Sequence, residues 1–288
     1  MTLFEKVSLL RADSVPADFS TFAEQNRHSV KNLLSLFLLL LANCQSGTEN
    51  VGSAANILAS AETTKPVSPA TSLAPKASVS TDYLLGKFEP AKHAEFVTVG
   101  KPYSDKPGMT LRKETFEAFK KMFAAAQKEG VTLKIISSTR NFFRQKEIWE
   151  GKWTRFAKDA PAAKNRALKI LEYSSMPGSS RHHWGTDIDI NELENHHFEK
   201  GGKHEKTYKW LTEHAHEYGF CQPYTAGRSS GYFEEKWHWS YTPLSKPFLE
   251  QFEKNIKDAD IKGFKGAETA TEIGIVKNYV LGINSACK

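Results

Sequence analysis

The sequence lacks the features that would assign it to nucleic-acid binding or to a repeat architecture. It contains no block of Lys and Arg, no zinc-knuckle spacing and no aromatic motif of the RNA-binding type, so we expect no nucleic-acid partner despite the net charge of +6. An anionic membrane surface or an acidic polymer such as cell-wall material would suit the same charge, and a merely solvated basic surface is the other interpretation. No internal repeat is visible.

Long hydrophobic runs are also missing. The most apolar stretch, residues 33–42, follows a basic segment at 27–32. About ten apolar residues are too short to cross a bilayer, which takes roughly 20 in a helix, but they suit the hydrophobic region of a signal peptide. The pattern therefore predicts export to the cell envelope or periplasm.

Residues 41–44 read Leu-Ala-Asn-Cys and resemble the lipobox of bacterial lipoproteins. In that motif the cysteine is lipidated and becomes the N-terminal residue, which would make Cys44 a membrane anchor. Asn43 departs from the usual Gly, Ala or Ser, so simple cleavage and an uncleaved anchor remain alternatives. We assign residues 1–44 to an export segment of lipoprotein type.

Cysteine is scarce, with three residues in the whole chain. If Cys44 carries lipid, Cys221 and Cys287 remain. An even pair in an exported protein is compatible with a disulfide, and two buried free thiols are the competing interpretation.

Aromatic residues are absent between residues 45 and 80, where Ser, Ala, Thr, Pro and Gly dominate. Such a stretch cannot bury enough apolar area to offset its ordering entropy, so it predicts a flexible linker. Aromatic residues return at Tyr83, which marks one folded domain over 81–288.

Helical and strand patterns are mixed along this domain, without regular alternation. Apolar residues recur at helical spacing from Phe116 to Ala126, and Gly130 stands where a C-terminal cap belongs. Further helices are predicted at 143–156, 161–173 and 206–218, and strands at 131–136, 187–190 and 236–241. This order predicts an α+β fold.

Two segments combine metal-ligand residue types with loop and strand context, 180–189 and 235–241. Zinc prefers imidazole nitrogen and carboxylate oxygen, and a catalytic site keeps one position for water. His182, Asp189 and His238 supply that donor set, and Glu235 is a candidate general base. Taken alone, a strand histidine such as His238 is more often structural than a ligand.

Read together, the two segments resemble the D-alanyl-D-alanine carboxypeptidases and dipeptidases of the VanY/VanX type, zinc peptidases also called the LAS group (peptidase family M15). The first family motif, Ser-x-His-x-x-Gly-x-Ala-x-Asp, is matched in register by Ser180, His182, Gly185 and Asp189. The second, Glu-x-x-His with Trp before the His, is matched by Glu235, Trp237 and His238. An upstream Arg followed by a Gln corresponds to Arg140 and Gln145.

The resemblance implies one zinc ion held by His182, Asp189 and His238, with Glu235 as general base. It also implies a small antiparallel sheet flanked by helices, of the LAS/hedgehog-like kind, with the metal in a cleft on the sheet.

Three further residues receive substrate roles from the resemblance. Arg140 would bind the carboxylate of the substrate or stabilise the oxyanion, since guanidinium pairs well with both. Ser180 would add a hydroxyl contact, or else satisfy nearby backbone. Gln145 would contact the substrate, although a polar residue on a helix is the simpler interpretation.

Two positions are ambiguous. Asp187 stands where the family has Ala, and it would either support a ligand or compete for the metal. His183 is adjacent to His182, and only the register to the motif's Gly and Asp selects His182; His183 is expected beside the site or at the surface.

The expected function is removal of the terminal D-Ala from peptidoglycan stem peptides or their precursors. An L,D-carboxypeptidase or an endopeptidase of the same family is an alternative. A lipoprotein that binds cell wall without turnover is another, since a fold does not determine a function.

Overall fold

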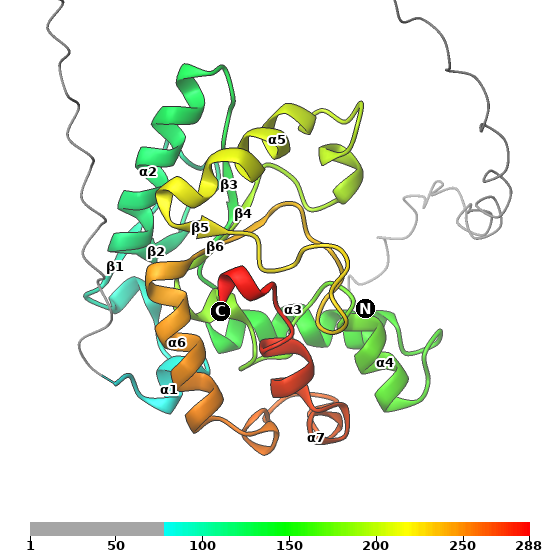
Figure 1. The fold of residues 1–288 in the computed structure, drawn as a ribbon. Coiled ribbons are helices and arrows are strands. Elements are labelled where there is room, and N and C mark those ends of the chain that lie inside the picture. Colours follow the sequence, from blue (N-terminus) through cyan, green and yellow to red (C-terminus); the bar gives the residue numbers. More distant parts are fainter. Residues whose placement is uncertain (1–77) are drawn as a thin grey trace, which may run out of the picture. The chain divides into compact units, whose positions relative to one another are not determined.

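The computed structural model describes residues 78–288 (Figure 1). The predicted export segment, the lipidation site Cys44 and all but the last residues of the predicted linker lie outside this range, so they stay predictions. Within the described range, no helix is long and apolar enough to cross a bilayer.

A four-stranded antiparallel sheet carries the segments singled out in the sequence. Its strands are β3 (Ile135–Ser137), β4 (Asp187–Ile190), β5 (Phe220–Cys221) and β6 (His238–Tyr241), in the order β3-β4-β6-β5. A separate pair, β1 (Phe96–Thr98) and β2 (Thr110–Arg112), is also antiparallel. The predicted α+β class with a small antiparallel sheet is confirmed.

The register between the central strands places the polar residues opposite each other. Asp189 pairs with His238, and Asp187 pairs with Ser240. Because opposed residues in an antiparallel pair share a face, these four side chains form one polar face. Neighbouring residues of both strands point to the other face and are apolar.

That apolar face packs against helices. Ile188, Ile190 and Trp239 belong to a buried cluster with apolar residues of α2 (Lys113–Lys128) and α5 (Glu205–His214). In Figure 1 these two helices lie together on one side of the sheet. Helix α2 has the predicted apolar face and ends as predicted, because Gly130 takes the left-handed φ of 67° that closes a helix.

The other helices build a second apolar cluster. They are α1 (Thr81–Leu84), α3 (Phe142–Arg155), α4 (Ala163–Ile170), α6 (Thr242–Asn255) and α7 (Thr269–Ile273). Short 3₁₀ segments are η1 (Pro90–Lys92), η2 (Arg181–Trp184), η3 (Asn195–Phe198), η4 (Ala215–Tyr218), η5 (Asp258–Asp260) and η7 (Ser285–Cys287), and a π-helical turn, η6, spans Val276–Val280. The polar side chains of the central strands lie on the face of the sheet opposite the first cluster.

The C-terminal segment is attached covalently to the sheet. Cys221 in β5 and Cys287 form a disulfide with Cα atoms 5.9 Å apart. Of the two interpretations left open, the structure supports the disulfide, a bond typical of exported proteins.

Two strand predictions were too long. The expected strand 131–136 is regular only over β3, and the expected strand 236–241 begins at His238. In both cases regular pairing exists only where a neighbouring strand supplies a partner, which is β4 for β3, and β4 together with β5 for β6.

Candidate functional site

A left-handed turn brings the two halves of the first motif together. His182 lies in η2 and Asp189 in β4, with Gly185 between them at a φ of 74°. A Cβ at this position would lie 2.4 Å from the ring of Phe96. Only glycine therefore allows both the turn and the close packing that direct η2 back onto β4.

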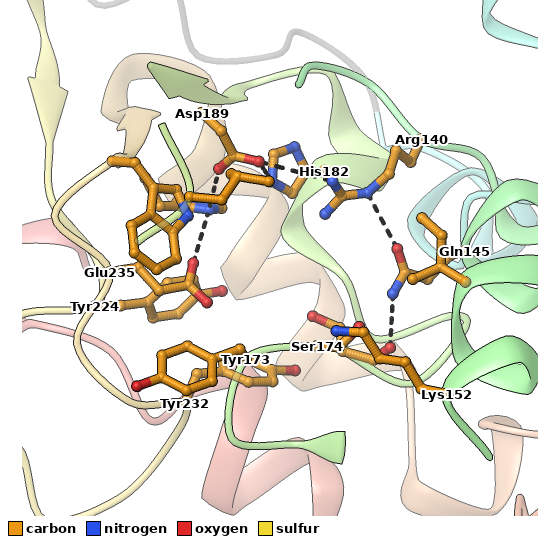
Figure 2. A pocket seen from close by; sticks show the side chains of 15 residues that line it. Arg140, Gln145, Lys152, Tyr173, Ser174, His182, Asp189, Tyr224, Tyr232 and Glu235 are labelled. Carbon is orange, nitrogen blue, oxygen red and sulfur yellow. Dashed lines mark hydrogen bonds and ion pairs between the residues drawn. The ribbon is translucent and has the colours of Figure 1, made fainter. Parts of the chain in front are cut away.

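The three predicted ligands converge. One side-chain atom of each of His182, Asp189 and His238 lies within 4.8 Å of those of the other two, and all three residues are buried. Nε2 of His182 is 3.4 Å from Oδ2 of Asp189, and Nδ1 of His238 is 3.1 Å from Oδ1 of the same carboxylate. Figure 2 shows His182 and Asp189 together at one end of a pocket.

A backbone carbonyl determines the tautomer of the His182 ring. Nδ1 of His182 is 2.9 Å from the carbonyl oxygen of Ser138, which can only accept, so Nδ1 carries the hydrogen. Burial and the nearby Arg140 lower the pKa of His182, which keeps the ring neutral. Nε2 therefore presents a lone pair to Asp189.

Asp187 orients the second histidine in the same way. Nε2 of His238 lies 2.8 Å from Oδ2 of Asp187, so Nε2 is the donor and Nδ1 faces Asp189. Burial opposes a charge on this ring, but the carboxylates of Asp187 and Asp189 outweigh burial and raise the pKa of His238 to about 9. The site thus attracts a positive charge at Nδ1, and a metal ion would supply that charge in place of a proton.

The donor set fits a metal ion. One nitrogen of each imidazole and a carboxylate oxygen of Asp189 lie within 4.8 Å of one another. Burial would raise the pKa of Asp189, but the two histidines outweigh it and hold the pKa well below its usual range. Within the described residues, Oδ1 of Asp189 is buried and accepts no hydrogen bond, although His238 is close. Two imidazoles and a carboxylate are the ligands of many catalytic zinc sites.

Asp187 contacts His238 through the other ring nitrogen and is not one of the three converging residues. Its Oδ2 accepts from Nε of Arg181 at 2.9 Å, and its Oδ1 accepts from the hydroxyls of Thr186 and Ser240. Burial alone would raise the pKa of Asp187, but Arg181 and His238 outweigh it and hold the pKa below its usual range. Both members of the Arg181–Asp187 pair are fully buried.

Glu235 lies next to the ligands in the loop before β6. Its Oε2 is 3.5 Å from Nδ1 of His238. The loop is held by its backbone, because the Glu235 N–H donates to the Tyr224 carbonyl and the Glu235 carbonyl accepts from Gln222. Burial and the charge of Asp189 raise the pKa of Glu235 to about 8, although His238 and Arg140 act in the opposite direction.

Arg140 reaches the site from the segment that follows β3. Its Nη1 is 3.7 Å from Oδ2 of Asp189 and donates to the hydroxyl of Ser137 at 2.6 Å. Its Nε donates to Oε1 of Gln145, whose Nε2 in turn donates to the carbonyl of Ser175. Gln145 is thus a buried link that orients Arg140, and its predicted contact with substrate stays a prediction.

Ser180 and His183 occupy different environments. The hydroxyl of Ser180 is buried, and no partner for it occurs between residues 78 and 288. His183 is buried rather than at the surface: its Nδ1 lies 2.6 Å from the Arg140 carbonyl and its Nε2 accepts from the Gly178 N–H. Burial lowers the pKa of His183 to about 3, so the neutral ring fixes the backbone of Arg140.

A cavity of about 340 Å³ opens onto these groups. Its walls include residues that the sequence did not indicate: Ile148, Lys152, Tyr173, Ser174, Ser175, Leu193, Tyr224 and Tyr232. Tyr224 packs against His238, with ring centroids 4.7 Å apart and the rings tilted by 53°. Trp237, the motif residue before His238, is also part of the wall. Figure 2 shows the labelled tyrosines on the side of the pocket opposite Arg140 and Gln145.

Comparison with known proteins gives a consistent picture. The family model described as "VanY: D-alanyl-D-alanine carboxypeptidase" matches residues 108–244, which include every predicted site residue. A putative carboxypeptidase, YodJ, of Bacillus subtilis (strain 168) is 34% identical over 135 residues, covering 46% of this chain and 46% of that protein. A D-alanyl-D-alanine carboxypeptidase of Enterococcus faecalis (strain ATCC 700802 / V583) is 29% identical over 128 residues, covering 43% of this chain and 45% of that protein.

The alignments with these two relatives span slightly less than half of the relatives' own length. An uncharacterized protein of Haemophilus influenzae (strain ATCC 51907 / DSM 11121 / KW20 / Rd) is 33% identical over 100 residues, covering 31% of this chain and 76% of that protein. A solved structure of a vancomycin-resistance D,D-pentapeptidase VanY mutant in complex with Zn(II) is 23% identical and covers 56% of this chain and 92% of its own, with a TM-score of 0.43.

Proposed function

Because the chain belongs to the VanY-type D-alanyl-D-alanine carboxypeptidase family, we propose that it is a zinc-dependent D,D-carboxypeptidase that removes the terminal D-Ala of peptidoglycan stem peptides. The observation that carries the proposal is the convergence of one ring nitrogen from each of His182 and His238 with the buried Asp189 carboxylate, with Glu235 beside them. One zinc ion would be held by Nε2 of His182, Nδ1 of His238 and the carboxylate of Asp189.

A zinc ion in this site would lower the pKa of a bound water toward about 7 and polarise the scissile carbonyl. Glu235 would take the proton of the attacking water and pass it to the leaving amine. A carboxyl group with a pKa near neutral can both accept and release a proton at neutral pH, as these two steps require. In the protein alone burial raises the pKa of Glu235, and a divalent ion beside the carboxyl group would lower that pKa toward neutrality.

Arg140 would stabilise the negative charge that develops on the carbonyl oxygen. Its guanidinium is oriented by neutral partners, Ser137 and Gln145, and lies beside the ligand Asp189. Donors that are oriented before the reaction need no reorganisation as the charge develops. Of the two roles implied by the resemblance, the position of Arg140 favours the oxyanion role.

Digestion of defined stem peptides tests the proposal. The protein supplied with zinc should release the terminal D-Ala from a pentapeptide that ends in D-Ala-D-Ala and leave the corresponding tetrapeptide intact. Chromatography of the products distinguishes the alternatives. Cleavage of the tetrapeptide alone would instead indicate an L,D-carboxypeptidase, and binding of peptidoglycan without any product would indicate a non-catalytic role.

A further inference from the structure

Lys152 brings a second cation into the pocket that holds the candidate metal ligands. Gln145, Ile148 and Lys152 follow each other at spacings of three and four residues along α3, so they share one face of the helix, and all three line the cavity. Figure 2 shows the side chain of Lys152 extending toward Ser174, below Arg140 and Gln145 in this view. Lys152 itself is half-buried.

This ammonium group has no partner in the part of the chain that the structure describes. The pocket's other cation, Arg140, has its guanidinium bonded to Ser137 and Gln145, whereas Lys152 feels only the more distant charges of Glu235, Arg140 and Arg155. Burial lowers the pKa of Lys152, since a charge that is partly removed from water and unpaired is destabilised. No intramolecular contact explains why the lysine points inward.

The charges that line the pocket favour an anionic ligand. Besides the two histidines, Arg140 and Lys152 are the basic residues of the wall, and Asp189 and Glu235 are the acidic ones. With neutral histidines as metal ligands and both carboxyl groups ionised, these four charges cancel. A divalent ion on the proposed ligands would leave the pocket with an excess of two positive charges. Arg140 lies beside Asp189, close to where the scissile carbonyl would bind. Lys152 is therefore available to bind a negative group of the substrate that lies farther from that carbonyl.

We infer that Lys152 forms a carboxylate subsite for the substrate, in addition to the groups that hold the metal and stabilise the oxyanion. The inference rests on the proposed function, because a carboxypeptidase substrate carries a free C-terminal carboxylate. A stem peptide with a diamino diacid as third residue carries a second carboxylate on that side chain. Both sources present the same chemistry to an ammonium group, and the test separates them.

The test compares the full-length protein with Lys152→Met and Lys152→Arg, and with Lys158→Met as matched control. Lys158 follows α3, is exposed and lies outside the pocket, so its replacement removes the same charge from the surface. Three pentapeptides serve as probes: one with lysine as third residue, one with diaminopimelate at that position, and the lysine peptide with an amidated C-terminus. KM and kcat are measured, and dissociation constants are measured in a Glu235→Gln background.

Losing a hydrogen bond between two charged groups should raise KM and the dissociation constant about tenfold to a hundredfold in Lys152→Met, with kcat changed much less. Lys152→Arg should recover part of the loss, and Lys158→Met should behave like the parent. If the effect disappears with the amidated peptide, the C-terminal carboxylate is the ligand. If it is confined to the diaminopimelate peptide, the side-chain carboxylate is the ligand.

Equal KM values and dissociation constants for the parent and Lys152→Met with all three peptides would overturn the inference, as would a loss in kcat alone. Either result leaves the proposed function intact, since the parent still releases D-Ala. The proposed function fails separately if the zinc-loaded parent binds the pentapeptides and cleaves none of them.

Discussion

Replacing Glu235 by glutamine should lower kcat for D-Ala release by about 10³-fold while the protein still binds zinc. General acid–base groups contribute roughly 10²–10⁴-fold to a rate. Glutamine keeps the size of the side chain but cannot accept a proton. Glu235 is outside the group of three converging ligands, so the metal content should stay at that of the parent. Steady-state kinetics and metal analysis of the same preparation provide both values.

Glu234→Gln is the matched control for this substitution. Glu234 is the preceding residue, and its carboxylate pairs with Lys236 instead of facing His238. The Glu234→Gln variant should therefore have kcat and KM values close to those of the parent. Unchanged turnover in Glu235→Gln would remove Glu235 from the mechanism, and loss of zinc together with activity would make it a ligand instead of a base.

Replacing Asp187 by alanine should destabilise the protein by about 3–5 kcal/mol and weaken zinc binding about 10- to 100-fold. Arg181 is fully buried, and without Asp187 its charge would have no acidic partner in the described residues. The His238 ring would also lose the acceptor that fixes its orientation. Urea unfolding and competition with a zinc chelator measure the two effects.

The size of the stability effect should depend on pH. The pKa of Asp187 is lowered in the folded state, so its contribution is present above the pKa of an unfolded aspartate, about 3.9, and is lost as the pH falls through the folded value. Asp187→Asn keeps an acceptor for His238 and should retain more zinc affinity than the alanine variant. It also serves if Asp187→Ala does not fold.

Glu272→Ala is the control for the buried pair. Glu272 pairs with Lys164 at the surface, where both side chains are about half exposed, and such pairs contribute at most about 1 kcal/mol. If Asp187→Ala were as stable as Glu272→Ala and bound zinc like the parent, Asp187 would not support the metal site.

The three residues that converge in the structure could be selected from the sequence because the spacing within each motif is local, and their role as metal ligands stays a prediction. One turn and part of one strand separate His182 from Asp189. The left-handed conformation of Gly185 defines the path of the backbone between them. His238 could be paired with this segment through its own motif, and the structure places it opposite Asp189. The choice of His182 over His183 agrees with the geometry, since His183 bonds the Arg140 backbone instead.

The pocket walls could not be predicted, because they come from segments far apart in the chain. The sequence places Lys152 on a predicted helix but does not indicate whether that face of the helix contacts solvent or lines a cavity. Tyr224 and Trp237 are large aromatic residues of the kind found in protein cores. Both are buried, yet both line the pocket. The role of Asp187 could not be predicted from the sequence either. Its partner Arg181 lies in η2, and strand alternation does not indicate which residue of η2 contacts Asp187.

The most direct test of the account is D-Ala release from a pentapeptide by protein stripped of metal and then titrated with zinc. The stripped protein should be inactive, and activity should return in proportion to zinc up to one ion per chain. The His182→Ala variant should neither bind the ion nor recover. Turnover that persists in metal-free protein, or a chain that binds no zinc, would contradict the account.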